Sequence, residues 1–566
     1  MTNDVFYKVL STNYKQQFER YKVMPNNTFK RRDFIRTLLG GFAVGSIDWN
    51  IFPRGNQTQQ GKDTFDAIII GAGLGGLSCG AAFARQGFKP LVLEQHSKPG
   101  GYATTFTRGG FTFDVSLHST TVGERNGLRN LINGFPEISD IEFVPHPDLF
   151  RVIYPELDMR VPQGNLPAFI ALLTKYFPEE KTGIEGIFAD MKGLSDDISK
   201  LSSLKGQPDM STFPADFQFL FKSMGKTWGD MVNARITNSK LRTLVSSLWG
   251  YYGLPPSKLS PFYYALPTYR YLVGGGYYPI GKSQKISDAL AGIITDRGGT
   301  VKLSSPVKEI LIKDHTAIGV KTENGDEYFA RVVVSNASAH STFLKMMHEE
   351  EFLNEYIQKM NGYSVSLSCF QVFLGLKSDL VKKTGIKDTE IFYNSGYDID
   401  ADYQACRTAD FNDPGYGLTL YDNLYKGYSP EGKNTLNILL LQGYEHWEKY
   451  ENDYFAGRKD LYNKEKKRMA DILIDKVEKT LLPGLRKEIE VMEIGTPLTN
   501  IRYTGNYRGA VYGWDQTLNN SGNSRVGHKT PIKNLYLAGA WSKPGHGYGA
   551  VIPSGLECFA EIMKGW

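Results

Sequence analysis

Residues 65–94, FDAIIIGAGLGGLSCGAAFARQGFKPLVLE, contain the elements that decide the fold. The apolar run at residues 66–70 is typical of a buried parallel strand, and residues 71–76, GAGLGG, fit the pattern G-x-G-x-x-G. Residues 74–86 can form a helix that ends at Gly87, and residues 90–93 predict a second strand. The stretch therefore predicts a β-α-β unit with a glycine-rich turn before its helix.

This unit has the features of a dinucleotide-binding site. Gly71 permits the tight turn that contains Ala72, Gly73 lets the backbone approach a pyrophosphate, and Gly76 lets the helix pack closely on the strand. The phosphates would lie at the helix N-terminus, where free N–H groups favour negative charge. Glu94 follows the glycines by about 20 residues, where a carboxylate accepts hydrogen bonds from a ribose, as in FAD or NAD. A glycine-rich turn of another α/β fold is the alternative interpretation.

The composition narrows the possible functions. The 566 residues are enough for two or more domains. The 65 basic and 60 acidic residues nearly balance, and no basic stretch interleaved with aromatic residues predicts nucleic-acid binding. None of the four cysteines is paired at the spacing of metal ligands, so we expect no metal site. The aromatic content of 13% fits either a large core or a wide cavity for an apolar ligand.

The N-terminal region resembles a twin-arginine export signal. Arg31 and Arg32 are followed by a polar residue, then Phe34 and Ile35, and then a weakly apolar segment. We therefore expect residues 1–62 to be an export segment and linker, giving a periplasmic or membrane-associated protein. A basic segment followed by a buried helix is the alternative, with the protein at the cytoplasmic surface of the membrane.

The rest of the chain alternates between helical and strand patterns. Residues 163–240 predict helices that form a cap over a cavity, a membrane-facing surface or ordinary core, and residues 247–280 are densely aromatic. Residues 332–336 are expected to rejoin the first sheet. Residues 365–374, 391–393 and 436–442 predict a second sheet, and residues 550–564 predict a closing helix.

Several motifs, taken in order, resemble the FAD-dependent phytoene desaturase, carotenoid isomerase and retinol saturase superfamily. They are residues 65–94, 99–102 (PGGY), 253–260 (GLPPSKLS), 333–336 (VVSN), 502–505 (RYTG) and 535–541 (LYLAGAW). The resemblance implies an α/β fold. Its parts are a Rossmann-type FAD-binding domain of the glutathione-reductase/amine-oxidase type, a mixed-sheet substrate domain and an inserted helical cap. It divides the chain into an FAD-binding domain at 63–160, 281–345 and 506–566, a cap at 161–280 and a substrate domain at 346–505.

The resemblance also assigns roles to individual residues. It implies that Gly71, Gly73 and Gly76 bind the pyrophosphate, that Glu94 binds the ribose, and that Val307 holds the adenine through its backbone. Gly101 and Tyr102 are expected beside the phosphates, and Gly539 and Val551 beside the flavin ring. His118 and His546 are candidates to line the catalytic site, with an ordinary polar role as the alternative for each.

The function implied is that of an FAD-dependent oxidoreductase with non-covalent FAD. It would act on carbon–carbon bonds of a polyene or isoprenoid-type lipid by desaturation, saturation or cis–trans isomerisation. The partners expected are an apolar small molecule, possible peripheral contact with a membrane, and an electron acceptor that is quinone, oxygen or a protein. Two alternatives stay open. One is a flavin amine oxidase for small polar substrates. The other is a non-catalytic prenyl-lipid-binding protein, like the Rab GDP-dissociation inhibitors.

Overall fold

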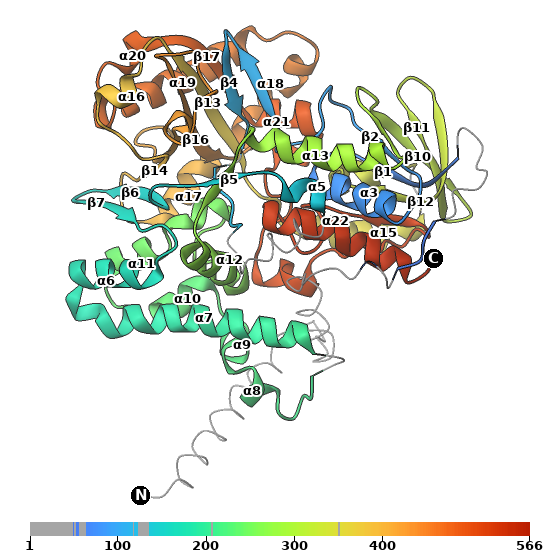
Figure 1. Cartoon of the computed structure of the whole chain (residues 1–566), viewed down its shortest axis with the longest axis horizontal. Coiled ribbons are helices and arrows are strands. Elements are labelled where there is room, and N and C mark those ends of the chain that lie inside the picture. The colour runs from blue at the N-terminus through green and yellow to red at the C-terminus, as the bar shows by residue number, and fades with distance from the viewer. Residues whose placement is uncertain are drawn as a thin grey trace, which may run out of the picture.

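The computed structural model describes residues 49, 52–55, 64–116, 118–122, 135–204, 208–348 and 351–566. Apart from Trp49 and residues 52–55, the expected export segment lies outside the described residues. The described part of the chain contains two seven-stranded sheets, two two-stranded sheets and many helices, which confirms the expected mixed α/β architecture (Figure 1).

The first sheet is built around β1 (Thr64–Ile70), which is parallel to β2 (Pro90–Leu93) and to β12 (Glu327–Ser335). Ala67 is opposite Val332, so residues 332–336 do rejoin this sheet. The remaining strands are β9 (Thr300–Lys302), β10 (Val307–Lys313), β11 (Thr316–Thr322) and β18 (Leu535–Leu537). The apolar residues of β1 are buried because helices and neighbouring strands cover both faces of the sheet.

Helix α3 (Leu74–Arg85) follows the glycine turn and packs against α22 (Tyr548–Met563), the last helix of the chain (Figure 1). The approach is close because both helices present glycine at the contact. A Cβ atom on Gly555 would lie 2.1 Å from the carbonyl oxygen of Gly75. The first sheet and its helices are therefore assembled from both ends of the described chain.

The second sheet runs in the order β17-β13-β16-β15-β14-β6-β7. Its strands are β17 (Ile489–Gly495), β13 (Ser368–Leu376), β16 (Asn434–Gln442), β15 (Tyr416–Thr419), β14 (Glu390–Tyr393), β6 (Phe150–Tyr154) and β7 (Leu157–Val161). It is mixed, because β14 pairs parallel with β6 whereas the other pairs are antiparallel. Helix α19 (Asp460–Thr480) shares the apolar core of β13 and β16.

Two expected domain boundaries need correction. Strands β6 and β7 belong to the second sheet, so residues 150–160 are not part of the first domain as expected. Helix α15 (Asn354–Asn361) buries Met360 in the same core as Phe65 and Val333 of the first sheet, although it was assigned to the substrate domain. Both errors arose because a sequence pattern identifies a strand or helix but not the sheet against which it packs.

The helical layer lies below the second sheet in Figure 1 and contains α6 (Leu166–Tyr176), α7 (Lys181–Ser203), α10 (Trp228–Asn233), α11 (Ser239–Val245) and α12 (Pro261–Gly274). It shares one continuous apolar core with β6 and β7. Trp228 of α10 stacks on Tyr264 of α12, with ring centroids 4.6 Å apart. This layer holds the aromatic stretch in a fixed position beside both sheets.

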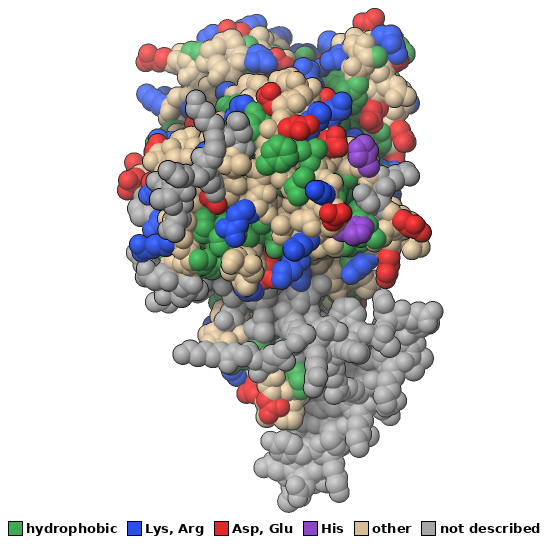
Figure 2. Space-filling view, turned by 90° about the vertical axis from the view of Figure 1, so that its right-hand side faces the viewer, with side chains coloured by type: hydrophobic (Ala, Val, Ile, Leu, Met, Phe, Trp, Pro, Cys, Tyr) green, Lys and Arg blue, Asp and Glu red, His purple; other side chains and the backbone are tan. Residues whose placement is uncertain are grey.

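Basic and acidic side chains are interspersed on the face of the molecule shown in Figure 2. Within the described ranges no helix is both long and apolar enough to cross a membrane. In the same residues, no group of three or more His, Cys, Asp or Glu side chains is placed to hold a metal ion.

Candidate functional site

A cavity of about 1280 Å³ extends from the glycine turn of the first sheet to the second sheet and the helical layer. Pockets for one small molecule usually measure about 300–1,000 Å³. The cavity is therefore large enough for a cofactor and a second ligand.

The glycine turn forms one end of the cavity, where Gly71 and Gly73 line the wall. Gly71 has φ of +92°, which favours glycine, and helix α3 begins at Leu74 with no side-chain cap. The first N–H groups of α3 therefore remain available for an anionic ligand. Gly76 does not line the cavity. A Cβ there would lie 2.1 Å from the carbonyl oxygen of Gly71 and 3.1 Å from a methyl carbon of Ile69 in β1. This glycine therefore lets the helix pack closely on the turn and the strand, and it is not placed to bind the pyrophosphate as expected.

Glu94 lies directly after β2 and lines the same end of the cavity as Val307 at the start of β10. Its carboxylate accepts hydrogen bonds from the backbone N–H groups of Ala72, at 2.7 Å, and His96, at 2.8 Å. Burial raises the pKa of Glu94, while these N–H groups act in the opposite direction. Ala72 contributes through this backbone contact and does not itself line the cavity.

Asn336, directly after β12, was part of a recognised motif, but its role was missed. Its side-chain amide donates to the carbonyl oxygen of Gly71 at 3.3 Å. A Cβ on Gly539 would lie 2.2 Å from Asn336 Oδ1, and one on Gly75 would lie 2.7 Å from it. Gly539 thus makes room for Asn336 rather than lining the cavity, and Asn336 joins the glycine turn to the end of β18.

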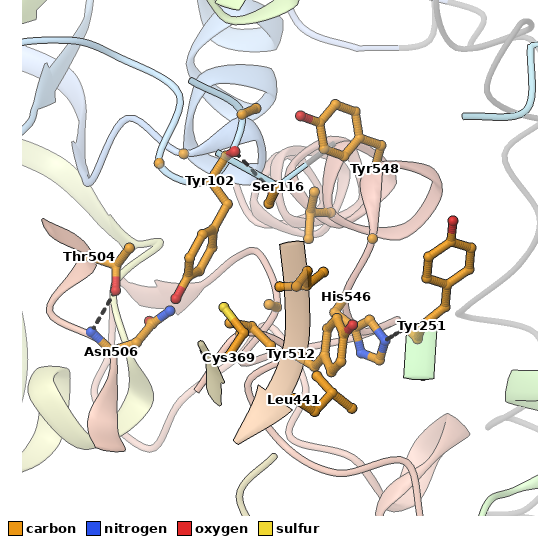
Figure 3. A pocket seen from close by; sticks show the side chains of 18 of the residues that line it. Tyr102, Ser116, Tyr251, Cys369, Leu441, Thr504, Asn506, Tyr512, His546 and Tyr548 are labelled. Carbon is orange, nitrogen blue, oxygen red and sulfur yellow. Dashed lines mark hydrogen bonds between the residues drawn. The ribbon is translucent and has the colours of Figure 1, made fainter. Parts of the chain in front are cut away.

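Gly101 and Tyr102 also line the cavity. Tyr102 is partly buried, and its ring points toward Thr504 and Asn506 (Figure 3). Burial raises the pKa of Tyr102 above its usual value, so the phenol keeps its proton. Thr504 and Asn506, which the ring approaches, line the same cavity.

Helix α22 begins beside the cavity. Its N-cap is Gly547, which has no side chain to accept from the first turn, and Val551 of that turn lines the wall. Gly539 fixes this end, because its N–H donates to Ser554 Oγ of the same helix at 2.9 Å. The N-termini of α3 and α22 thus both open into one cavity.

His546 lies just before α22, between two tyrosine rings. Its ring centroid is 4.2 Å from that of Tyr512 and 5.0 Å from that of Tyr263. Its Nε2 atom lies 3.2 Å from the carbonyl oxygen of Tyr251 (Figure 3). Burial lowers the pKa of His546 to about 3, so the imidazole is neutral at physiological pH.

His118 also lines the cavity, and its Nδ1 atom lies 2.9 Å from Glu390 Oε1. The hydroxyl of Tyr251 donates to the same carboxylate oxygen at 2.5 Å. Sequence reasoning missed Glu390 and gave Tyr251 only as one of many aromatic residues. A single acid at the start of a short strand carries no signal that could have found it. The two candidate histidines are thus brought to opposite ends of Tyr251, His118 near its hydroxyl and His546 at its carbonyl.

Acidification is expected to destabilise the native state through three buried histidines. Burial lowers the pKa of His146 and His340 to about 4 and that of His546 to about 3. The unfolded chain takes up these protons near pH 6.5, so the free energy of unfolding falls as pH drops from about 6.5 toward 4. At pH 5.5 the loss should be about 1 kcal/mol per histidine.

Urea unfolding at pH 7 and pH 5.5 measures this loss. His340→Gln should lose less stability than the wild type between the two pH values, because His340 packs outside the cavity and is one of the three groups. His348→Gln is the matched control, since the His348 side chain is 86% exposed. Equal losses in the wild type and His340→Gln would contradict the assignment.

The residues that line the cavity fit a flavin dinucleotide. The turn at residues 71–76 provides a cradle that a Cβ would obstruct. Glu94 lies in the cavity wall where it could bind the ribose next to the phosphates, and the N-termini of α3 and α22, both without a side-chain cap, face the same cavity. One N-terminus suits phosphates, and the other suits negative charge on a reduced flavin ring.

Comparisons with known proteins agree with this geometry. The model of the family described as flavin containing amine oxidoreductase matches residues 74–562. A prolycopene isomerase from an Oncidium hybrid cultivar is 27% identical over 88% of this chain and 84% of its own length. An all-trans-retinol 13,14-reductase from Danio rerio is 28% identical over 89% and 86%. The resemblance to the superfamily of desaturases, isomerases and retinol saturases is thereby confirmed.

Solved structures show the same fold. An oxidoreductase from Methanosarcina mazei aligns with a TM-score of 0.58 at 17% identity, over 88% of this chain and 100% of its own. The family match and the relatives identify a flavin-dependent oxidoreductase. The chain belongs to the flavin-containing amine oxidoreductase family.

Proposed function

We propose that this FAD-dependent oxidoreductase acts on carbon–carbon bonds of a polyene or isoprenoid-type lipid, by desaturation, saturation or cis–trans isomerisation. The observation that carries the proposal is the aromatic part of the cavity, which continues directly from the dinucleotide cleft past the N-terminus of α22. Its lining includes Leu248, Trp249, Tyr251, Tyr252, Tyr263, Leu266, Tyr271, Phe392, Leu439 and Leu441. The two relatives above are named for prolycopene and retinol, which are both polyenes.

The cofactor would be held without a covalent bond. The N–H groups at the start of α3 would bind the pyrophosphate, Glu94 the ribose, and the backbone at Val307 the adenine. Tyr102 would lie by the phosphates and Val551 by the flavin ring. Cys369 also lines the cavity, but burial raises the pKa of its thiol to about 12, so it remains protonated and a poor nucleophile.

Hydride transfer is the chemistry that a bound flavin supplies. The chain contributes position, exclusion of water and charge stabilisation. The uncapped N-terminus of α22 would stabilise negative charge on a flavin ring bound beside it. The aromatic walls hold an extended apolar chain and keep water away from the reacting carbons. His546 is neutral and wedged between two rings, so it shapes the chamber without adding charge.

The visible absorption spectrum of the purified protein tests this function. We expect a flavin band that bleaches on anaerobic reduction and that is released into solution when the protein is denatured. A co-purifying polyene spectrum would identify the substrate class. Folded full-length protein that contains no flavin, and takes up none from added FAD, would leave lipid binding as the better explanation. Reduction of the flavin by amines and by no polyene would favour the amine oxidase alternative.

The location and the electron acceptor are further proposals that rest on sequence alone. The paired arginines at positions 31 and 32 support export of the folded holoprotein, to the periplasm or the membrane surface. Because the sequence has no second G-x-G-x-x-G, quinone, oxygen or a protein is the proposed acceptor. Cell fractionation of the wild type and a variant with both arginines replaced by lysine would test export.

A further inference from the structure

Glu390 is a buried acid in the wall of the substrate chamber. It begins β14, and its side chain is 1% exposed. No Lys or Arg in the described part of the chain pairs with it, and its Oε2 atom is buried without a hydrogen-bond partner in those residues. Keeping such a carboxylate out of water is costly, so its presence calls for an explanation beyond packing.

Two proton-bearing side chains meet on the other oxygen. Tyr251 donates its hydroxyl to Glu390 Oε1, and His118 Nδ1 lies 2.9 Å from the same atom. The hydroxyl of Thr419 lies 2.9 Å from that nitrogen and completes its surroundings. A carboxylate can only accept, so the arrangement places the imidazole proton on Nδ1. His118 Nε2, on the other side of the ring, keeps its lone pair.

The groups around Glu390 do not supply a competing charge. His146 is neutral, because burial lowers its pKa to about 4. Tyr271 of α12 and Tyr421 near β15 face the carboxylate as neutral phenols, because burial raises the pKa of both well above the usual value. The same holds for Tyr251. His146 and the three tyrosines therefore surround the carboxylate in their neutral forms.

We propose that His118, Glu390 and Tyr251 form the proton relay of the reaction, with His118 Nε2 as the group that exchanges a proton with the substrate. This inference rests on the proposed function. In the direction of desaturation, a bound flavin would accept a hydride from one carbon, and Nε2 would accept the proton of the neighbouring carbon. The electron pair of that second C–H bond becomes the new double bond, so the substrate loses two electrons and the flavin gains them.

Glu390 and Tyr251 act on this step through His118. The imidazolium that forms becomes the ion-pair partner of Glu390, which stabilises the charge in the apolar wall. Tyr251 holds the carboxylate in place through its hydroxyl. In the direction of saturation the same proton is delivered from Nε2 to carbon while a hydride arrives at its neighbour. Glu390 and Tyr251 are positioning residues, and His118 is the catalytic residue.

The first experiment needs no substrate. In the holoprotein with ¹⁵N-labelled histidine, two-bond ¹H–¹⁵N spectra should show the His118 resonance with a protonated Nδ1 and an unprotonated Nε2. Glu390→Gln should shift this resonance or exchange the tautomer. A His118 that carries its proton on Nε2 in the wild type, or one that is unchanged in Glu390→Gln, would overturn the relay.

The second experiment follows the flavin spectrum anaerobically with all-trans-retinol and a cis-carotene as probes. Glu390→Gln should slow the polyene-dependent change about 100-fold, within the range of general acid–base catalysis. It should also move the pH dependence of that rate to lower pH, because the imidazolium loses its counter-ion. In His118→Ala the polyene-dependent change of the flavin spectrum should be abolished, and added imidazole should restore part of its rate. Tyr251→Phe, which keeps the ring, should give an intermediate effect.

Tyr264→Phe is the matched control. Tyr264 is a buried tyrosine of the same aromatic stretch, and its hydroxyl donates to the carbonyl oxygen of Val245, away from the cavity. If the wild type responds to a polyene and Glu390→Gln responds equally with an unchanged pH profile, the relay is wrong and the function stands. If the flavin of the wild type responds to no polyene, the proposed function fails and the relay fails with it.

Discussion

A protein with alanine at position 76 should no longer retain its flavin. The added methyl group would lie 2.1 Å from the carbonyl oxygen of Gly71 and 3.1 Å from a methyl carbon of Ile69. The first contact is with the backbone of the turn that forms the dinucleotide cradle. The clash can therefore be relieved only if the turn or α3 shifts. Overpacking of this kind costs about 1–3 kcal/mol. We expect a lower melting temperature and loss of the flavin absorption band at equal protein concentration.

Gly292→Ala provides the control for this change. Gly292 lies within α13 (Lys282–Asp296), and a Cβ there would meet no other atom within 4 Å. Alanine in a helix interior is about 1 kcal/mol more favourable than glycine, so this variant should be as stable as the wild type or more stable, with full flavin. A Gly76→Ala protein with normal flavin content and normal melting temperature would contradict the packing argument.

Replacing Arg525 by methionine should cause the largest loss of stability among these changes. The Arg525 guanidinium is buried and donates to the carbonyl oxygens of Trp514, Asn520, Ala540 and Ser542, at 2.6 to 3.4 Å. Trp514 and Asn520 lie before β18, and Ala540 and Ser542 lie between β18 and α22. Methionine fills a similar volume but leaves four buried acceptors without a donor, which costs about 1 kcal/mol each.

The charge of Arg525 adds to this effect. Arg525 is attracted to the buried carboxyl of Asp515, whose pKa burial raises to about 6. Removing the guanidinium takes away the largest of the three positive charges that act on that acid, and leaves those of Arg407 and Lys258. Chemical denaturation should show a loss of about 4 kcal/mol, with weaker flavin binding because the start of α22 is no longer fixed. Arg458→Met is the control, since the exposed pair of Arg458 with Asp453 should contribute less than about 1 kcal/mol. If the Arg525→Met and Arg458→Met variants were equally stable, the hydrogen bonds of Arg525 would not stabilise the segments before and after β18 as proposed.

The parts of the site that could be predicted are those formed within short stretches of sequence. Gly71, Gly73 and Glu94 belong to one unit of 30 residues, so their spacing alone placed them at one end of a cavity. Tyr102, Val307 and Val551 needed the family resemblance as well. All six line the cavity.

The parts that could not be predicted depend on contacts between distant segments. Asn336 meets Gly539 across the end of the first sheet, and Glu390 meets His118 across the chamber wall. No periodicity records which side chain faces which across such separations. The assignment of β6 and β7 to the wrong domain has the same origin. β7 pairs with its neighbour β6, but β6 joins the second sheet through β14, which lies more than two hundred positions later in the chain.

The arrangement of β1 between β2 and β12, with α22 packed on α3, has a consequence for synthesis of the protein. A ribosome makes β1 and α3 early, but the strand that pairs with one edge of β1 follows only after residue 326, and the helix that covers α3 follows near residue 548. Until then the nascent chain exposes an unpaired apolar edge and an uncovered helix, which favour aggregation. The flavin site can be completed only after translation is nearly finished. We therefore expect chaperone protection and cofactor supply to limit the yield of active protein more than the speed of translation does.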